Sequence, residues 1–376
     1  MARPALPGVL GRLLHNDSAG GLVLLAAALV ALVWANSPLA ASYHHLWDTP
    51  LGPAPNLHFW VNDGLMALFF LLVGLEIRRE LHGGVLSDRQ RALLPLVAAL
   101  GGVVVPALIY MVFNGSSGLG HGWAVPTATD IAFAVGVLGL LGPRVPPSLR
   151  ILLLAIAIVD DIVAILAIAL FYSDGIDPLG LAVAAAATAA YVALQRSGTR
   201  PLVVSILLGV VLWGGLLWAG VHPSLAGVIT GVLTAEPDAD RAEEALHPWI
   251  VFGVMPLFAL VNAGVSLGSL AWVPGVTPAL VAGIVAGLVV GKPLGILAAT
   301  ALTVKLGWTR LPPDLTLPRI AVIGALAGIG FTMSIFISEL AFDDPALLGA
   351  AKLAVLVASG LAGIGGLVAG YRVLGR

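Results

Sequence analysis

Twelve long apolar runs, separated by short polar or Pro/Gly breaks, constrain this chain more than any other feature of its sequence. A transmembrane helix needs about 20 apolar residues, and most of the runs approach or exceed that length. Charged residues make up only 10% of the chain, whereas soluble domains carry about 25%, so most of the surface must face lipid. The runs lie near residues 19–36, 60–80, 92–113, 122–142, 148–172, 178–195, 201–219, 223–235, 248–263, 277–301, 318–340 and 347–371.

These runs predict an all-α integral membrane protein with twelve transmembrane helices, forming a single polytopic membrane domain over residues 1–376. Transmembrane β-strands would alternate polar and apolar residues over about ten positions, whereas these runs are continuous and rich in Ala, Leu and Gly. The net charge is -2 without a basic tail, so no nucleic acid partner is expected. The chain contains no cysteine, which excludes disulfides and thiolate chemistry.

The basic residues predict how the chain is oriented. The alternate loops 37–59, 114–121, 173–177, 220–222, 264–276 and 341–346 contain no Lys or Arg. Loops rich in Lys and Arg stay on the cytoplasmic side, so both termini are expected in the cytoplasm. Of the 18 basic residues, 16 lie at the ends of runs, in the remaining connections or near the termini, and only Lys292 and Lys352 lie further inside runs. The others are Arg3, Arg12, Arg78, Arg79, Arg89, Arg91, Arg144, Arg150, Arg196, Arg200, Arg241, Lys305, Arg310, Arg319, Arg372 and Arg376.

Four ionisable side chains lie near the middle of predicted spans, namely Asp130, Asp160, Asp161 and Lys292. A charged side chain at that depth costs about 2.5–3.5 kcal/mol on insertion scales. A static buried ion pair would explain one aspartate with Lys292, but it does not easily explain three carboxylates and one ammonium. The set therefore favours a water-accessible cavity lined by carboxylates.

The neighbouring pair Asp160 and Asp161 indicates what such a cavity would bind. Adjacent helical residues point about 100° apart, so one can face the cavity while the other faces a partner such as Lys292. Two carboxylates this close and partly removed from water favour uptake of a proton near neutral pH. The same oxygens suit Na⁺ or Li⁺, and no sulfur or histidine cluster is present for a transition metal. Competition between a proton and a hard cation is the chemistry of a cation/proton exchanger.

The fourth and eleventh runs contain helix-breaking residues at mid-depth. Pro126 precedes Thr129 in the fourth run, and Gly328 and Gly330 precede Thr332 in the eleventh. Proline and glycine weaken helices, and freed backbone groups in the membrane must line a cavity or be buried in protein. Ordinary kinking is the alternative for either run alone. Because the two runs are an odd number of spans apart, spans 3–5 and 10–12 are predicted to be inverted repeats, each with a broken middle helix.

Several stretches together resemble the bacterial NhaA-type sodium/proton antiporters. The resemblance implies twelve helices in which broken helices 4 and 11 cross, and a homodimer in the bacterial inner membrane without a cofactor. It also implies electrogenic, pH-regulated exchange of cytoplasmic Na⁺ or Li⁺ for external H⁺, which would maintain intracellular pH and sodium homeostasis. The stretches are NDGLMALFFLLVGLEIRREL (62–81), GWAVPTATDIAFAVGVLGLLGPRVP (122–146), LLLAIAIVDDIVAILAIALFY (152–172), GVHPSLAGVITG (220–231), LHPWIVFGVMPLFALVNAGVSL (246–267), GLVVGKPLGI (287–296) and GIGFTMSIFI (328–337).

The resemblance also implies roles for single residues. Asp161 would be the main carrier of cation and proton, and Asp160 would bind or release a proton and pair with Lys292. Thr129 and Asp130 would assist the cation or balance the charged ends of the facing half-helices.

A cytoplasmic cluster would sense pH by the same resemblance. It consists of Glu76, Arg79 and Glu80 at the end of the second run, with Glu243 and His247 near the start of the ninth. The alternative is a solvated helix end with a surface histidine. Glu339, near the outer end of the eleventh run, is expected to be a snorkelling surface residue.

The sequence thus predicts a secondary antiporter rather than an enzyme, with the lipid bilayer as its surroundings and Na⁺, Li⁺ and H⁺ as its ligands. Two other classes are possible. A cation channel usually presents rings of charge built by symmetry, whereas these acids lie in one asymmetric chain. An intramembrane aspartyl protease needs two facing carboxylates, which adjacent residues do not provide, although Asp130 could supply a partner.

Overall fold

The computed structural model describes residues 17–51, 54–173, 175–269 and 276–375, and helices dominate all four ranges. Arg3, Arg12 and Arg376, which were used to predict the orientation, lie outside the described residues. Each predicted run coincides with a helix or a group of consecutive helices, as follows. The groups are α2 (Asp17–Ala35); α4, η1 and α5 (Leu57–Phe59, Trp60–Leu65, Met66–His82); α6 (Arg89–Asn114); η3 and α7 (Gly120–Thr127, Ile131–Gly139); α8 (Pro147–Phe171); α9 (Pro178–Arg196); α10 (Leu202–Trp218); α11 (Leu225–Leu233); α12, η5 and α13 (Asp238–Trp249, Ile250–Val254, Met255–Asn262); α14, η7 and α15 (Val276–Ala286, Gly287–Gly291, Lys292–Lys305); α16 and α17 (Leu317–Ala327, Phe331–Ala341); and α18 (Pro345–Leu374).

The described helices confirm a polytopic α-helical protein but not twelve full spans. Within the described ranges, eight helices are long and apolar enough to cross a membrane, or up to ten if each of two bent pairs is one span. Helix α10 is slightly shorter, with 17 residues. Helix α11 has nine residues, which at about 1.5 Å per residue is less than half of the roughly 30 Å hydrocarbon core.

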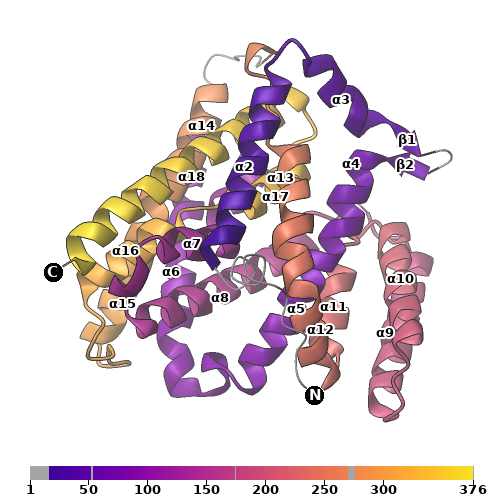
Figure 1. Cartoon of the computed structure of the whole chain (residues 1–376), viewed down its shortest axis with the longest axis horizontal. Helices are drawn as coiled ribbons and strands as arrows, with labels where there is room; N and C mark the ends of the chain where they lie inside the picture. Colours follow the sequence, from indigo (N-terminus) through magenta and orange to yellow (C-terminus); the bar gives the residue numbers. More distant parts are fainter. Residues whose placement is uncertain (1–16, 52–53, 174, 270–275, 376) are drawn as a thin grey trace, which may run out of the picture.

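The segment between the first two spans contains more structure than a loop. Helix α3 (Ala40–Asp48) follows α2 at an angle of 113°. Strands β1 (Pro50–Leu51) and β2 (Ala54–Asn56) then pair antiparallel, and all three elements project at the upper right of Figure 1. The short 3-10 helices η2 (Val85–Ser87), η4 (Gly142–Arg144) and η6 (Leu267–Ser269) lie in other connections.

The predicted start of the ninth span was wrong. Helix α12 begins at Asp238, ten residues before the predicted position 248. Residues 238–247 are largely polar, so hydropathy alone places the start of the apolar run after them, at residue 248. The helix nevertheless continues, because Asp238 and Asp240 in its first turn interact favourably with the positive end of the helix dipole.

Both predicted helix breaks are present, and they meet in space. The 3-10 helix η3 ends at Thr127, and after extended Ala128 helix α7 begins with Asp130 as its N-cap. Helices α16 and α17 meet at an angle of 48°. The Asp130 amide donates to Ile329 O at 2.7 Å, so the two breaks are joined directly. A Cβ atom at Gly328 would clash with Leu288 O and lie 3.1 Å from Ala325 O, so this close approach favours glycine.

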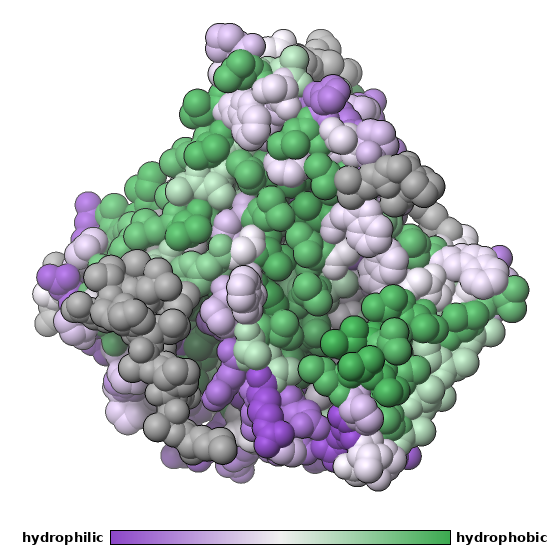
Figure 2. All heavy atoms as spheres, turned by 45° about the vertical axis from the view of Figure 1, so that its right-hand side comes forward, coloured by the Kyte–Doolittle hydropathy of each residue, from purple (hydrophilic) through white to green (hydrophobic). Residues whose placement is uncertain are grey.

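The broken helices lie inside the protein, and a hydrophobic surface surrounds them. In Figure 1 the short helices α7 and α17 lie near the centre, whereas α9 and α10 stand at one side. Figure 2 shows a broad hydrophobic face, with hydrophilic residues gathered toward its lower end. Leu202, Val203 and Leu207 of α10 are each more than half exposed, as expected for a surface that faces lipid. In chain order, the broken helix of the first predicted repeat lies between α6 and α8, and that of the second lies between α15 and α18.

Candidate functional site

The four mid-span charges and Thr129 converge on the crossing of the two broken helices. Asp160 and Asp161 lie in the middle of α8, which is continuous through this region. Lys292 is the first residue of α15, directly after the π-helix η7. All five side chains belong to residues that are at most 1% exposed, so the structure places them together in the interior.

Asp130 caps two helices at once. Its Oδ1 accepts from the Phe133 amide of α7 at 2.9 Å. Its Oδ2 accepts from the Thr332 amide of α17 at 3.1 Å and from the Thr332 hydroxyl at 2.5 Å. Helix N-termini carry partial positive charge and unpaired N–H groups. One carboxylate therefore compensates the positive ends of both α7 and α17 where they meet.

Lys292 provides a positive charge at the same crossing. Its ammonium forms an ion pair with Asp160 Oδ2 and donates to Thr129 Oγ1 at 2.9 Å. The exposed fraction of both charged side chains is 0%. Removing either partner of such a buried pair is strongly destabilising, because it leaves the other charge uncompensated.

The Thr129 hydroxyl has two acceptors within reach but only one hydrogen. Asp160 Oδ2 lies 2.7 Å from Thr129 Oγ1, and Ala327 O, at the end of α16, lies 2.8 Å from it. A hydroxyl donates one hydrogen bond and can accept others. Thr129 therefore accepts from Lys292 and donates to either Asp160 or the end of α16, but not fully to both.

Two carboxylate oxygens of the site have no hydrogen-bond partner among the described residues. They are Oδ1 of Asp160 and Oδ1 of Asp161, and both are buried. An unsatisfied buried acceptor costs roughly 1–3 kcal/mol, so these oxygens favour a ligand that carries positive charge. A proton or a hard monovalent cation meets that requirement. The described residues contain no group of three or more His, Asp and Glu arranged to hold a metal, and a transported cation is cargo rather than a resident metal.

Within the predicted pH-sensing cluster, the members have different surroundings. Arg79 forms an ion pair with Glu243, which connects α5 to α12. Glu80 instead accepts from the Val85 amide at 2.8 Å, and His247 is exposed. Glu76 lies within electrostatic range of Arg79, Glu80 and Glu243 on one side and of Asp161 on the other. Glu76 is thus a member of the cluster that also lies within electrostatic range of the ion site.

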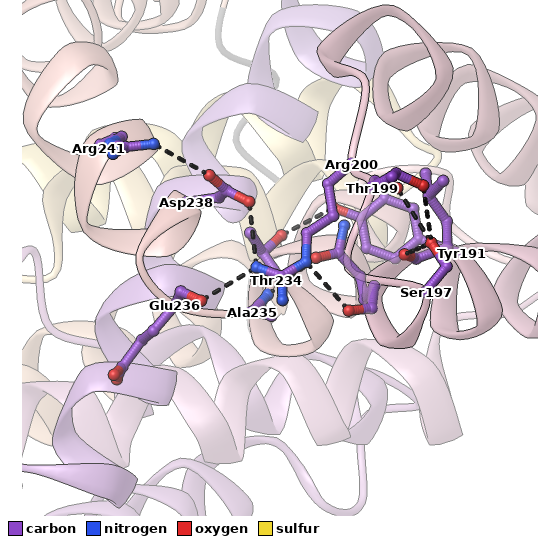
Figure 3. A network of polar contacts seen from close by, with 11 residues as sticks. Tyr191, Ser197, Thr199, Arg200, Thr234, Ala235, Glu236, Asp238 and Arg241 are labelled. Atoms are coloured by element: carbon purple, nitrogen blue, oxygen red, sulfur yellow. Dashed lines mark hydrogen bonds and ion pairs between the residues drawn. The ribbon is translucent and has the colours of Figure 1, made fainter.

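A polar network positions the start of α12, and sequence reasoning had missed it (Figure 3). Arg200, after α9, donates to Glu236 O at 3.0 Å and to Asp238 Oδ2 at 3.2 Å. Tyr191 of α9 is hydrogen-bonded to Thr234 Oγ1 at 2.7 Å. These contacts fasten the α9–α10 pair to the segment that leads into α12, and so to the helix that carries Glu243. Arg200 was noted in the sequence only as a cytoplasmic charge.

Two further residues near α17 differ from expectation or were not predicted. Ser359 Oγ accepts from the Phe331 amide at 3.0 Å and so caps α17 from α18; a single serine in an apolar run carried no signal. Glu339 is not a snorkelling surface residue, because it forms an ion pair with Lys352 and its side chain is only 15% exposed. The expectation failed because the partner, Lys352, lies on the next helix and neutralises the carboxylate inside the protein.

Comparison with known proteins gives a consistent result. The family model described as Na⁺/H⁺ antiporter 1 matches residues 11–369. The chain is 53% identical to the Na⁺/H⁺ antiporter NhaA of Acidovorax sp. (strain JS42) over 382 residues, covering 96% of this chain and 92% of that protein. It is 49% identical to NhaA of Bordetella petrii, with 93% and 87% covered. The sodium proton antiporter MjNhaP1 from Methanocaldococcus jannaschii shares the fold, with a TM-score of 0.56, 14% identity and 98% of each chain covered.

Proposed function

The chain belongs to the Na⁺/H⁺ antiporter 1 family and exchanges sodium ions for protons, and from that premise we propose that the exchange takes place at Asp160 and Asp161. The observation that carries this proposal is the pair of buried, unpartnered Oδ1 atoms on these adjacent residues. Their acceptor capacity is matched by a proton or by an alkali cation. Li⁺ is included as a cargo because it presents the same charge to the same oxygen ligands.

Coupling follows from competition for the same oxygens. A protonated carboxyl group has lost the charge that binds Na⁺ or Li⁺, and a carboxylate that holds a cation binds a proton less readily. Each ligand thus shifts the equilibrium that governs the other. The site must also open to one side of the membrane at a time, because otherwise the two gradients would dissipate without exchange.

The surrounding residues tune this competition. Lys292 compensates Asp160, whereas Asp161 has no paired cation among the described residues. Asp130 is engaged by the N-termini of α7 and α17, so its role is to hold the crossing and balance charge there. Both Asp130 oxygens are occupied by these contacts, whereas an aspartyl protease would need one to face its partner acid.

Exchange is further proposed to be electrogenic and regulated by cytoplasmic pH. Two neighbouring carboxylates can carry more protons than cations in one cycle, so net charge can move. Glu76 supports regulation, because it lies within electrostatic range of both Asp161 and Glu243. A change in protonation near α5 and α12 would therefore alter the field at the ion site.

The distribution of Lys and Arg supports an orientation with both termini in the cytoplasm, and the bacterial relatives support a location in the bacterial inner membrane. We also propose that two copies form a homodimer, as the family resemblance implies. In this setting the protein would act as a transporter and not as an enzyme. It would maintain intracellular pH and sodium balance.

The test is proton flux triggered by Na⁺ or Li⁺ in proteoliposomes, measured across pH with and without a clamp on the membrane potential. The unaltered protein should give saturable, cation-dependent flux, and electrogenic exchange should respond to the clamp. Asp161→Asn should abolish the flux in a folded, inserted protein. Asp343→Asn makes the same chemical change at an exposed loop residue and should leave the flux unchanged. Normal exchange by Asp161→Asn would refute the assignment of the site.

A further inference from the structure

A second group of polar side chains, most of them largely buried, lies at the opposite end of the protein from the Arg-rich loops. We name this group the outer cluster, and it consists of His58, Asn62, Asn262, Glu339 and Lys352. Each member lies within about two turns of a loop that lacks Lys and Arg. None of them contacts the ion site, and the exchange chemistry described above does not use them.

The outer cluster is a continuous chain of contacts. Lys352 forms an ion pair with Glu339, and its ammonium lies 3.4 Å from Asn262 Oδ1. His58 Nε2 lies 3.7 Å from Glu339 Oε1, and the Asn262 amide donates to Asn62 Oδ1 at 2.8 Å. The side chains of Glu339 and Lys352 are 15% and 12% exposed. This pair is therefore largely desolvated, unlike the exposed pairs that contribute little.

The cluster connects two different sets of helices. Glu339 and Lys352 lie on α17 and α18, which belong to the second predicted repeat. His58 and Asn62 lie on α4 and η1, and Asn262 ends α13; these elements lie outside both repeats. The outer ends of the repeat and non-repeat helices are thus held together by charge and hydrogen bonds. By contrast, the cytoplasmic ion pair Arg79–Glu243 joins α5 and α12, two helices that both lie outside the repeats.

Helix α17 links this cluster to the ion site. Thr332, near its start, binds Asp130, and Glu339 follows seven residues later, which is about two turns and about 10 Å along the same face. The helix is also fastened to α18 near both ends, by the Phe331–Ser359 hydrogen bond and by the Glu339–Lys352 ion pair. Helix α17 therefore cannot move at its outer end without α18 unless one of these contacts breaks.

An aromatic layer lies between the cluster and the site. Phe336 is one turn beyond Thr332 on α17 and is 1% exposed. Its ring centroid lies 5.4 Å from that of Phe70, 6.1 Å from that of Phe258 and 5.1 Å from that of His222. All three partners belong to elements outside the repeats. The boundary between the two sets of helices is thus sealed first by aromatic rings and then by the outer cluster.

We propose that the outer cluster is the external gate of the exchange cycle, and that Glu339 and Lys352 are its positioning residues. While the site is accessible from the cytoplasm, the cluster holds α17 and α18 against α4 and α13. Exposure of the site to the outside requires these contacts to separate and water to reach Phe336. The inference rests on the exchange proposed above, since a gate has meaning only in an alternating-access cycle.

The absence of native cysteine allows a direct test with single-cysteine variants. Phe336→Cys places a thiol beneath the cluster, and its rate of modification by a water-soluble maleimide reports opening. The purified full-length protein is labelled in detergent, so that the sidedness of a membrane does not enter. Phe336→Cys also removes a ring of the aromatic layer, which could by itself increase labelling. Met66→Cys, a second reporter buried one turn from Phe70, keeps that ring and controls for this effect.

Adding Glu339→Gln should raise the labelling rate of both reporters about fivefold or more, since the lost pair is largely desolvated. Lys352→Gln should do the same, and the reversed pair Glu339→Lys with Lys352→Glu should return the rate toward that of the parent. Asp343→Asn, in the adjacent loop, should not change it. A cysteine at buried Ala98 of α6 should stay unlabelled in every variant, which shows that the fold is intact.

Transport provides a readout that a purely structural role would not move. In Glu339→Gln the KM for cytoplasmic Na⁺ should rise while the maximal rate is largely kept, because fewer molecules face the cytoplasm. Unchanged labelling of both reporters in Glu339→Gln, or failure of the reversed pair to restore slow labelling, would overturn the gate. The Asp161→Asn flux test is independent of these reporters. The experiments can therefore refute the proposed gate without refuting the proposed ion site, and the reverse.

Discussion

The buried pair between Asp160 and Lys292 allows the sharpest quantitative test of the site. Lys292→Gln leaves the Asp160 carboxylate with the Thr129 hydroxyl as its remaining described partner. Asp160→Asn leaves the Lys292 ammonium with the same hydroxyl. The double substitution removes both charges and leaves two neutral amides that can hydrogen-bond to each other. The three variants therefore differ mainly in whether an unpaired charge is buried.

The expected losses follow from the burial of both groups. Each single substitution strands a charge in a position of 0% exposure, which costs about 3–5 kcal/mol. Independent effects would thus sum to at least about 6 kcal/mol. The double variant strands no charge, so its loss should not exceed that of either single variant. The coupling energy is then at least about 3 kcal/mol, at the upper end of values for contacting residues.

Thermal unfolding in detergent at a fixed scan rate measures this coupling, with intrinsic fluorescence of the nine tryptophans as the signal. At roughly 2 °C per kcal/mol for a large chain, each single variant should lose about 6–10 °C. The double variant should lose no more than either single variant, instead of about 12–20 °C. The exposed change Asp343→Asn, which alters one charge without stranding another, should leave the midpoint where it is. Additive losses would show that the two side chains do not interact energetically, and would refute the conclusion that their ion pair stabilises the site.

Three further expectations concern stability. Asp130→Asn should lower the unfolding midpoint by several degrees, since an amide offers one acceptor oxygen to two helix ends and a lost cap costs about 1 kcal/mol or more; an unchanged midpoint would contradict the double cap. Gly74→Ala should destabilise by about 1–3 kcal/mol, because a Cβ there would lie 2.6 Å from Val228 O and force α5 from α11, whereas Gly214→Ala, with open space around it, should be neutral or stabilising by roughly 0.5–1 kcal/mol. Burial lowers the pKa of His222 from 6.5 to about 4. As pH drops from 6.5 to 4, the unfolded chain therefore binds a proton before the folded protein does, and the free energy of unfolding should fall by up to about 3 kcal/mol. His222→Gln should remove this dependence from unfolding measured across that pH range, and an unaltered slope would argue against a neutral, buried imidazole.

The central charges could be predicted from the sequence because their position is costly. A carboxylate or ammonium in the middle of an apolar run needs a compensating role, so the sequence alone identifies Asp130, Asp160, Asp161 and Lys292. The contacts among these four side chains are harder to predict from the sequence. Residue spacing alone indicates that one aspartate of the adjacent pair can face Lys292, but the rotation of α8 that selects Asp160 is set by tertiary packing.

Glu339 shows where such reasoning fails. An acid two residues from the end of α17 resembles one that reaches the interface, so its depth gave no warning. The available signal was Lys352, an opposite charge on the far side of the short turn 342–344. Two charges flanking a tight antiparallel turn can meet inside the protein. The early start of α12 has a similar explanation. Its acidic first turn is too polar to belong to the apolar run, but acidic residues favour a helix N-terminus.

The single hydrogen of Thr129 has a consequence for how occupancy at the acid is conveyed to the backbone. When Asp160 is ionised, it attracts that hydrogen; when Asp160 carries its own proton, rotation about the Thr129 Cβ–Oγ bond frees the hydrogen for Ala327 O. The last turn of α16 then gains or loses a donor according to what the acid holds. A residue that never titrates would thereby translate ion exchange into a change at the end of a helix, without any movement of α8.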